Sequence, residues 1–365
     1  MKVSINQTTL SETLSIVQKG VSPRTTLPIL AGIFIETQGD QVVFQSTDLE
    51  LSIKCAVPAL VEEQGRAVIP GKILTDIVKS LPDAAVHMQI DDSGAVIACD
   101  QSSFSVRCMD PVDFPLFPSL QEDQSVSLPF EDFARMAKKV FRMVSKDETR
   151  AILTGVLLEV VGATMKMVAT DSYRLAVAEA ACPVVENDFS AVLAGSFIAD
   201  LANLPRTGED IRIGLADNQV IVSYGGTTFV NRRIEGNYPN YRQLLPASCT
   251  TICTVDRQAL LAGVKRASLL GKSGSRVRFS VDSVTHTIQL SSTTQEVGST
   301  QETVRCQVEG PDIEIGFNSY YVSEGLSAMD SSEVTFELQA PVKPGIFRGT
   351  GDENYLYLIM PVKMN

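Results

Sequence analysis

A cluster of basic side chains is the part of this sequence best suited to chemistry. Four of its members recur at helical spacing: Arg135, Lys138, Lys139 and Arg142. Intervals of three, one and three residues place them on one face of an α-helix, opposite an apolar stripe. Lys146 and Arg150 extend the cluster, so residues 131–150 hold six basic and four acidic side chains in a chain of net charge −12. Exposed cations of this kind suit contact with phosphate groups.

Smaller basic groups occur in two other predicted helical segments. Lys72 and Lys79 belong to one segment, and Lys265 and Arg266 to another, whereas the last helix carries Glu324 and no cation. None of these groups alternates with aromatic residues or resembles a base-reading motif. Each has two interpretations, a solvated helix face or a sequence-independent contact with nucleic acid. The acidic net charge argues against the second interpretation only if the charge is evenly spread.

The usual catalytic and metal-binding patterns are missing from the sequence. The two histidines, His87 and His286, fall in strand-like stretches without a motif around them. There is no phosphate-binding loop, dinucleotide fingerprint, zinc-protease motif or nucleophile elbow. Asp91-Asp92 and Asp352-Glu353 stand close to glycines, where turns favour acidic residues. We therefore expect neither an enzyme nor a metal or cofactor site.

Composition indicates an ordinary globular protein. The chain has 365 residues, of which 44% are apolar and 20% charged, and we expect several sizeable cores. Neither a signal peptide nor an apolar run long enough for a membrane span is present, which favours the cytoplasm. Seven cysteines without a CxxC pair favour reduced, buried thiols: Cys55, Cys99, Cys108, Cys182, Cys249, Cys253 and Cys306,.

The sequence pattern that contains these residues is repeated three times along the chain. Leu30-Ala31-Gly32 recurs as Leu153-Thr154-Gly155, and Thr47-Asp48 recurs as Thr170-Asp171, both 123 residues later. Each copy is long enough to bury its own core, unlike the short units of a solenoid. We expect three domains, at residues 1–121, 127–246 and 250–365.

The sequence pattern of each copy predicts the same order of helices and strands. A short strand and an amphipathic helix come first, then four short strands, a second helix and three more strands. The basic helix of the second copy is expected over Glu131 to Val144, and the third copy's helices near Arg257 to Leu270 and Ser319 to Met329. This order predicts an α+β fold in which two helices per copy cover antiparallel sheets.

Several motifs, in order and over nearly the whole chain, resemble those of one family. They are Thr26 to Leu30, Ala169 to Val177, Glu235 to Arg242, Ile315 to Asn318 and Tyr357 to Val362. The family is the beta subunit of bacterial DNA polymerase III, the sliding clamp. The resemblance implies a head-to-tail homodimer in which six copies form a ring around double-stranded DNA, with no sequence preference. It also implies as partners the replicative polymerase, the clamp loader and other proteins with a clamp-binding peptide motif.

The resemblance further assigns residues to a partner-peptide groove between the second and third copies. They are Leu153, Thr170, Ser172, Tyr173, Arg174, Leu175, Pro239, Gln243, Leu244, Pro344, Leu358, Ile359, Met360, Pro361 and Val362. Apolar side chains with a few polar neighbours suit an extended peptide. The sequence departs from the family at Ser172, where glycine is usual after the aspartate, and at Gln243, where arginine is frequent.

DNA contacts and a dimer interface follow from the same resemblance. The expected DNA-binding residues are Arg24, Lys79, Arg135, Lys138, Lys139, Arg142, Lys146, Arg150, Lys265 and Arg266. An aromatic pair that the family uses for DNA is replaced here by Ala151 and Ile152. The expected interface residues are Lys72, Phe104, Val106, Leu269, Leu270, Glu296 and Glu302. The basic pair usual before Phe104 is absent.

Three other interpretations compete with that of a three-copy clamp that is loaded and binds a polymerase. An enzyme with its site at a domain boundary would need titratable groups in a pocket, which the sequence does not supply. A trimeric clamp has two copies per chain and is excluded by the three copies present here. A related clamp that has lost loading or polymerase binding remains open.

Overall fold

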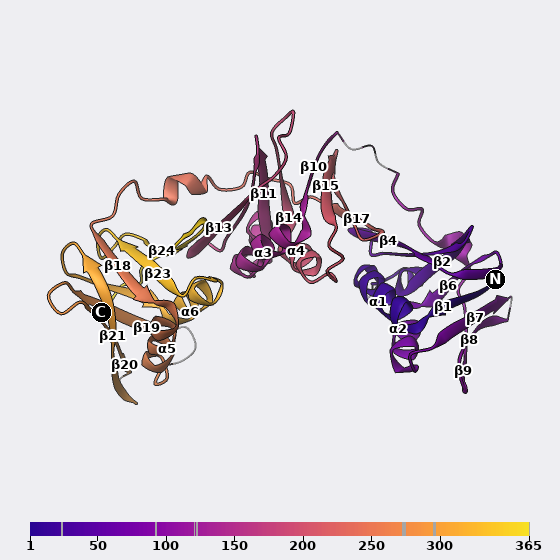
Figure 1. The fold of residues 1–365 in the computed structure, drawn as a ribbon, viewed down its shortest axis with the longest axis horizontal. Helices are drawn as coiled ribbons and strands as arrows, with labels where there is room; N and C mark the ends of the chain where they lie inside the picture. The colour runs from indigo at the N-terminus through magenta and orange to yellow at the C-terminus, as the bar shows by residue number, and fades with distance from the viewer. Residues whose placement is uncertain are drawn as a thin grey trace. The chain divides into compact units, whose positions relative to one another are not determined.

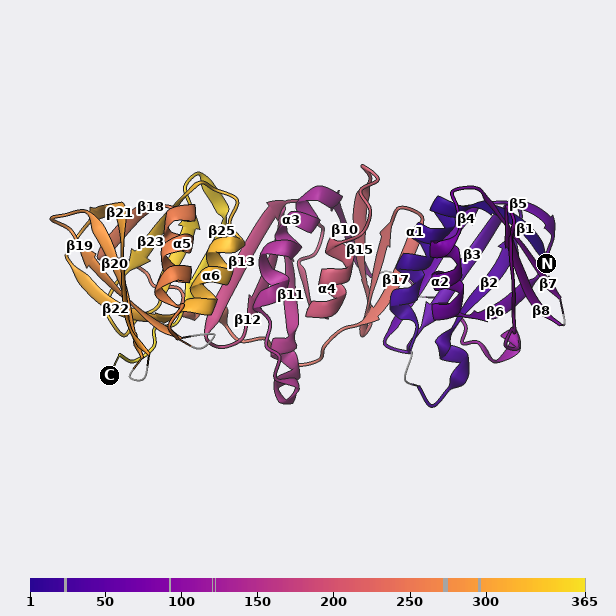
Figure 2. The ribbon, with the colours of Figure 1, turned by 90° about the horizontal axis from the view of Figure 1, so that it is seen from below.

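The computed structural model describes residues 1–22, 25–91, 93–119, 121, 123–271, 275–294 and 297–364. These residues form two compact units. The first consists of residues 1–131 and 203–233, and the second of residues 132–202 and 234–365. Figures 1 and 2 show the elements of each unit from two directions.

The first unit contains the whole first copy and four strands of the second. Its elements are β1 (Lys2–Asn6), α1 (Gln7–Val17), β2 (Gly32–Gln38), β3 (Gln41–Thr47), β4 (Leu51–Pro58), β5 (Leu60–Glu63), β6 (Arg66–Pro70), α2 (Gly71–Ser80), β7 (Ala85–Asp91), β8 (Gly94–Cys99), β9 (Ser102–Val106), β10 (Gln124–Pro129), β15 (Asp210–Ala216), β16 (Gln219–Tyr224) and β17 (Thr227–Arg232). The strands form a five-stranded sheet, ordered β5-β1-β7-β8-β9, and an eight-stranded sheet, ordered β10-β15-β16-β17-β4-β3-β2-β6. Helices α1 and α2 lie side by side against them (Figure 1).

The second unit contains the rest of the second copy and the whole third copy. Its elements are α3 (Phe130–Val140, which starts just ahead of the unit), β11 (Gly155–Val161), β12 (Thr164–Thr170), β13 (Arg174–Ala181), β14 (Phe189–Ala194), α4 (Gly195–Ala202), β18 (Thr251–Asp256), α5 (Arg257–Ala267), β19 (Arg276–Asp282), β20 (Thr287–Thr294), β21 (Gly298–Glu309), β22 (Ile313–Asn318), α6 (Ser319–Ser327), β23 (Glu333–Leu338), β24 (Gly345–Gly349) and β25 (Asp352–Ile359). One twelve-stranded sheet runs through it, ordered β14-β11-β12-β13-β25-β24-β23-β18-β21-β20-β19-β22. Helices α5 and α6 lie side by side (Figure 2).

The repeat between the first two copies extends to single backbone angles. Strands β2, β3 and β4 reappear 123 residues later as β11, β12 and β13, with the same lengths. The hairpin glycines match as well, since Gly39 has a φ of 60° and Gly162 a φ of 57°. Leu49 and Ser172, also 123 residues apart, both take left-handed angles of 77° and 79°. From β2 to the end of β4, the second copy therefore follows the first without an insertion.

The copies are joined through sheet edges. Strand β4 of the first copy pairs antiparallel with β17, which ends the second copy. Strand β13 of the second copy pairs in the same way with β25, which ends the third copy. Strand β9 ends the first copy, as β17 and β25 end the others, but it pairs with no strand of another copy among the described residues. The first half of β21, which corresponds to β4 and β13 in the third copy, also pairs with no described strand of another copy.

Helices in two of the three copies begin directly after a capped strand end. Asn6 Oδ1 accepts the backbone N–H of Thr8 at 2.9 Å, and Asn318 Oδ1 accepts that of Tyr320 at 2.9 Å. Asp256 Oδ1 accepts the N–H of Ala259 at 2.7 Å. Asn and Asp are favoured at this position because the side-chain oxygen satisfies a free donor of the first turn.

Three helices end earlier than their apolar periodicity predicts, and one histidine lies outside its predicted strand. Helix α3 ends at Val140 and continues only as a 3-10 turn, Phe141–Met143. The third copy's helices likewise end two or three residues earlier than expected. His87 lies in β7 as predicted, whereas His286 occupies a turn with a φ of 50°, so its placement in a strand was wrong.

Candidate functional site

A tight turn between β12 and β13 is the centre of the candidate groove. Asp171 Oδ1 accepts the backbone N–H groups of Tyr173 at 2.9 Å and Arg174 at 3.1 Å. Thr170 Oγ1 donates to the Arg174 carbonyl at 2.7 Å, which closes the turn. Ser172 takes the left-handed conformation at its apex. This geometry explains why glycine is usual there, since only glycine adopts it without strain.

Arg174 connects this turn to helix α6. Its guanidinium is buried, bonds Asp171 Oδ2 through Nε at 2.9 Å, and forms an ion pair with Glu324. Nη2 donates to the Arg142 carbonyl at 3.2 Å, and the Tyr321 ring lies 4.5 Å from the guanidinium carbon. Burial disfavours the charged form, but Tyr357, Glu324 and Asp171 outweigh it and hold the pKa of Arg174 above its ordinary value. The turn and α6 are therefore held as one body.

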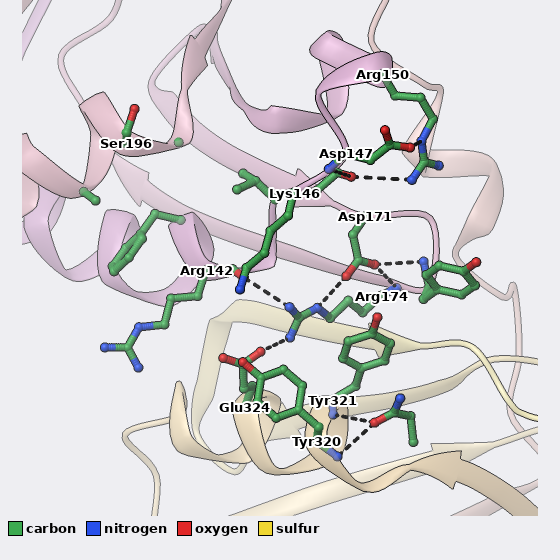
Figure 3. A pocket seen from close by; sticks show the side chains of 17 residues that line it. Arg142, Lys146, Asp147, Arg150, Asp171, Arg174, Ser196, Tyr320, Tyr321 and Glu324 are labelled. Atoms are coloured by element: carbon green, nitrogen blue, oxygen red, sulfur yellow. Dashed lines mark hydrogen bonds and ion pairs between the residues drawn. The ribbon is translucent and has the colours of Figure 1, made fainter. Parts of the chain in front are cut away.

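A cavity of about 710 Å³ opens beside Arg174. Its walls come from the chain after α3, from the start of α4, and from α6 (Figure 3). Tyr173 and Tyr320 are exposed at it, and Tyr173 stacks on Tyr321 with ring centres 6.3 Å apart. The cavity also receives Arg142, Lys146 and Arg150, three of the predicted DNA-binding residues.

The apolar side chains predicted to form the floor of the groove belong to one continuous cluster, called here the floor cluster. Leu175 and Leu358 face each other across the β13–β25 pair, and Met360 packs against the same cluster. The other buried members are Leu157, Val168, Val177, Val192, Tyr241, Ile346 and Leu356. Burial raises the pKa of the Tyr241 phenol, and so does the hydrogen bond that it donates to Glu159 at 2.8 Å. An apolar floor with few polar neighbours is suited to hydrophobic side chains of a peptide.

The remaining predicted groove residues surround this floor. Leu153 and Thr170 are buried, Pro344 and Pro361 are half-buried, and Pro239 is exposed. Gln243 and Leu244 are exposed on a 3-10 turn, Tyr241–Leu244. After β25 the chain is held by two backbone bonds, from Met360 to the Tyr173 carbonyl at 2.8 Å and from Val362 to the Gly316 carbonyl at 2.9 Å.

Sequence reasoning missed several residues of this site. Ile346, Tyr321 and Glu324 come from β24 and α6, and no local pattern connects them with a turn about 150 residues earlier. Tyr238 and Tyr241 did have a signal, because they belong to the motif Glu235 to Arg242. Both rings pack against the floor cluster.

One predicted DNA-binding residue has a different role. The side chain of Lys139 is only 9% exposed and bonds Asp352 at 2.7 Å and Asp330 at 3.2 Å. It also lies 5.1 Å from the centre of the Tyr355 ring. The expectation that four cations share one exposed face was wrong for Lys139, because the third copy covers that edge of α3.

The other described members of the basic set are exposed. Arg135 pairs with Asp132 at 2.5 Å, Arg150 with Asp147 at 2.9 Å, and Arg266 with Glu302 at 2.8 Å. The hydrogen bonds that Asp147 accepts from Thr149 and Arg150 lower the pKa of its carboxyl. Exposed cations without an ion pair in the described part of the chain are Lys79, Lys138, Arg142, Lys146 and Lys265. Arg24 lies outside the described residues.

The predicted interface residues that the structure describes lie on β9, on β21, on α2 and directly after α5. Phe104 and Val106 belong to β9, and Phe104 is 36% exposed. Leu269 follows α5 and is 74% exposed, and Leu270 beside it is half-buried. Lys72 is exposed on α2. Glu302 lies in β21 but pairs with Arg266 of its own chain, and Glu296 lies outside the described residues.

Two other features bear on the class of protein. Within the described ranges, no three or more histidine, cysteine or acidic side chains are grouped so that they could hold a metal ion. No helix in the part of the chain that the structure describes is long and apolar enough to span a membrane.

Comparison with known proteins places the whole chain in one family. Models of the DNA polymerase III beta subunit match in order: the N-terminal domain over residues 1–118, the central domain over 127–240 and the C-terminal domain over 242–363. The beta sliding clamp of Staphylococcus aureus is 33% identical over 98% of this chain and 96% of its own length. That of Synechocystis is 31% identical over 100% of both.

Solved structures agree with the sequence comparisons. The DNA polymerase sliding clamp from Bacillus subtilis has a TM-score of 0.94 at 29% identity, covering 100% of both chains. The DNA polymerase III beta subunit from Thermotoga maritima has a TM-score of 0.94 at 25% identity, again with full coverage. The chain belongs to the family of bacterial DNA polymerase III beta subunits, the beta sliding clamps.

Proposed function

We propose that this chain is a processivity factor of DNA replication that acts without catalysis of its own. Two copies associate head to tail into a closed ring around double-stranded DNA, and the ring holds the replicative polymerase at its template. A ring cannot leave a closed DNA circle by diffusion, so contacts with the DNA can be weak. Its place of action is the cytoplasm, where bacterial DNA is replicated.

The observation that carries this proposal is the pattern of strand pairing between copies. Two connections, β4 with β17 and β13 with β25, join the end of one copy to the fourth strand of the copy before it. The same rule applied once more pairs β9 of one chain with the first half of β21 of another. Exposed strand edges present unpaired N–H and C=O groups and favour such pairing. Two chains leave no edge of this kind unpaired.

Contact with DNA is proposed for the exposed basic residues. Lys138 and Arg142 follow one another along α3 and the turn after it, and Lys265 and Lys79 lie on α5 and α2. Mobile surface cations bind phosphates without reading bases, and their contribution falls as salt rises. The acidic remainder of the surface does not retain DNA.

Binding of partners is proposed for the groove beside the turn at residues 170–174. Peptide motifs of the replicative polymerase, the clamp loader and other proteins would place apolar side chains on the floor that Leu175, Leu358 and Met360 share. The exposed edge of the groove, with Ser172 and Gln243, differs from the family's usual residues and would tune which peptides bind.

The proposal is tested by mass and by polymerase activity together. Light scattering at micromolar concentration should give twice the chain mass of 39.5 kDa. The replicative polymerase with its clamp loader should then copy long stretches of primed circular DNA per binding event only when the protein is present. A strict monomer contradicts the ring. A dimer that leaves the polymerase's product length unchanged identifies a related clamp without polymerase binding.

A further inference from the structure

The cavity next to Arg174 has charges that the groove does not use. Four cations and three carboxylates line it. Arg150 is paired with Asp147 at 2.9 Å, and Arg174 with both remaining carboxylates. Arg142 and Lys146 have no acidic partner within ion-pair distance among the described residues. Figure 3 shows the Lys146 side chain extending into the cavity toward Arg174.

Tyr173 joins this cavity to the groove. Its carbonyl accepts the N–H of Met360, a predicted groove residue, at 2.8 Å, while its side chain lines the cavity. A peptide bound on the groove floor therefore ends within reach of the cavity. A charged residue tethered to such a peptide has a high effective concentration at Lys146.

We infer that the cavity takes the carboxylate of an aspartate or glutamate flanking the docked segment of a partner peptide, with Lys146 as its ion-pair partner. This inference rests on the proposed function of the groove. A carboxylate matches the net positive charge that is left after the internal pairs are counted. The recess between α4 and α6 admits a side chain, whereas phosphates of a duplex lie along an exposed surface.

Peptide binding tests this inference. A labelled peptide with the clamp-binding segment of the replicative polymerase is extended by two aspartates or by two asparagines, at each end in turn. For one of the two ends, the aspartate form should bind about threefold to fivefold tighter than the asparagine form, as expected for a partly exposed ion pair. The preference should disappear in Lys146→Gln and remain in Arg66→Gln, which removes an exposed cation from the other unit.

Each contrary result has its own meaning. No preference at either end, or a preference that survives Lys146→Gln, overturns the inference. Weaker retention of Lys146→Gln on circular DNA, with unchanged peptide preferences, assigns Lys146 to DNA instead. If no peptide binds the unaltered protein, the groove itself is wrongly proposed.

A different observation concerns the last described residues. Strand β22 is the outermost strand of the twelve-stranded sheet, and the chain end runs along its free edge. Val362 donates to the Gly316 carbonyl at 2.9 Å, and Arg276 Nη1 donates to the Lys363 carbonyl at 3.1 Å. A Cβ atom on Gly316 would lie 2.1 Å from Met364 Sδ and 3.1 Å from the Val362 carbonyl oxygen. The φ of Gly316 is not positive, so its backbone conformation does not require glycine. The close approach of Met364 and Val362 is therefore the feature that favours glycine at this position,.

We propose that Gly316 and Met364 are positioning residues for the groove. The Met364 side chain covers the space above Gly316 and fixes residues 360–363 as one wall of the groove. Neither residue is a member of the floor cluster. This proposal also rests on the groove being a peptide site.

A double-mutant cycle tests the pair. Gly316→Ala and Met364→Ala should each weaken binding of the polymerase peptide about threefold to tenfold, with unchanged dimer mass and unfolding temperature. The double variant should be no weaker than either single variant, because both changes release the same contact. Additive losses, or no loss in Gly316→Ala, contradict the proposal. Absence of peptide binding in the unaltered protein contradicts the groove itself.

Discussion

Ser172 is held in a backbone conformation that side chains other than glycine rarely adopt. Its φ of 79° lies in the left-handed region. Its own N–H donates to Thr170 Oγ1 at 3.2 Å, and the N–H of Tyr173 donates to Asp171 Oδ1 at 2.9 Å. A non-glycine residue there costs about 1 kcal/mol or more. The serine hydroxyl accepts one exposed bond from Arg150 at 3.0 Å, which offsets part of this strain.

We therefore expect Ser172→Gly to raise the free energy of unfolding by about 0.5–1 kcal/mol. Chemical denaturation of the purified variants measures this. Leu49→Gly, at the matching position of the first copy with a φ of 77°, should act in the same direction. A destabilised Ser172→Gly would show that the hydroxyl, and not the backbone angle, governs this turn.

Arg174 matters because two carboxylates depend on it. Asp171 and Glu324 are largely buried and have no other cation within ion-pair distance in the described chain. Arg174→Ala leaves both unpaired and should lower the free energy of unfolding by about 3 kcal/mol. Arg242→Ala removes an exposed pair with Glu159 and should cost less than about 1 kcal/mol,. Equal losses in the two variants would contradict this ranking.

Lys138 and Lys139 are neighbours with opposite surroundings. Lys139 is buried against Asp352, whereas Lys138 is exposed. Lys139→Ala should lower the free energy of unfolding by about 2 kcal/mol and leave the salt dependence of DNA binding unchanged. Lys138→Ala should leave stability within about 0.5 kcal/mol and reduce the slope of log affinity against log salt by up to about 0.9. The reverse assignment of effects would return Lys139 to the DNA-binding set.

Pairing between the edges of strands joins one copy to the next. Strand β9 carries Phe104 on an edge that β17 and β25 use for pairing in the other copies. Phe104→Asp introduces a charge at the proposed seam and should weaken the dimer at least about tenfold. Val184→Asp, at another exposed apolar residue, should leave it unchanged. Sedimentation over a dilution series measures dimer dissociation of both variants. If Phe104→Asp dissociates no more readily than the unaltered protein, β9 is not part of the dimer interface.

The elements themselves were largely predictable. Local alternation and helical spacing place β2, β3 and β4, and the recurrence of Thr47-Asp48 as Thr170-Asp171 extends that prediction to the second copy. Helix ends were less well predicted, because the apolar stripe of α3 continues past Val140 into a 3-10 turn. The family resemblance supplied the groove and seam residues, which no single-copy pattern contains.

Contacts between distant parts of the chain could not be predicted. The helical spacing of Lys139 gives its angle on α3, but not the presence of Asp352, 213 residues later. The pairing of β4 with β17 joins residues more than 170 positions apart. Such pairings depend on which edges remain free after each copy has folded, and a local pattern carries no information about that.

The whole molecule combines three similar copies with different roles. The second copy supplies the basic helix and the turn of the groove, and the third supplies α6 and the chain end that complete it. The first copy supplies β9, and the third the first half of β21, each with one edge that no described strand pairs. Repetition thus produces the pairing rule, and divergence between copies produces the sites.

Retention on DNA of defined topology tests the ring most directly. The protein is loaded onto nicked circular duplex DNA by its clamp loader, and the complex is isolated by gel filtration at moderate salt. We predict that it stays bound to the circle and is lost when a restriction enzyme linearises the DNA. Equal retention before and after linearisation, or equal loss from both, would contradict a ring that encircles DNA.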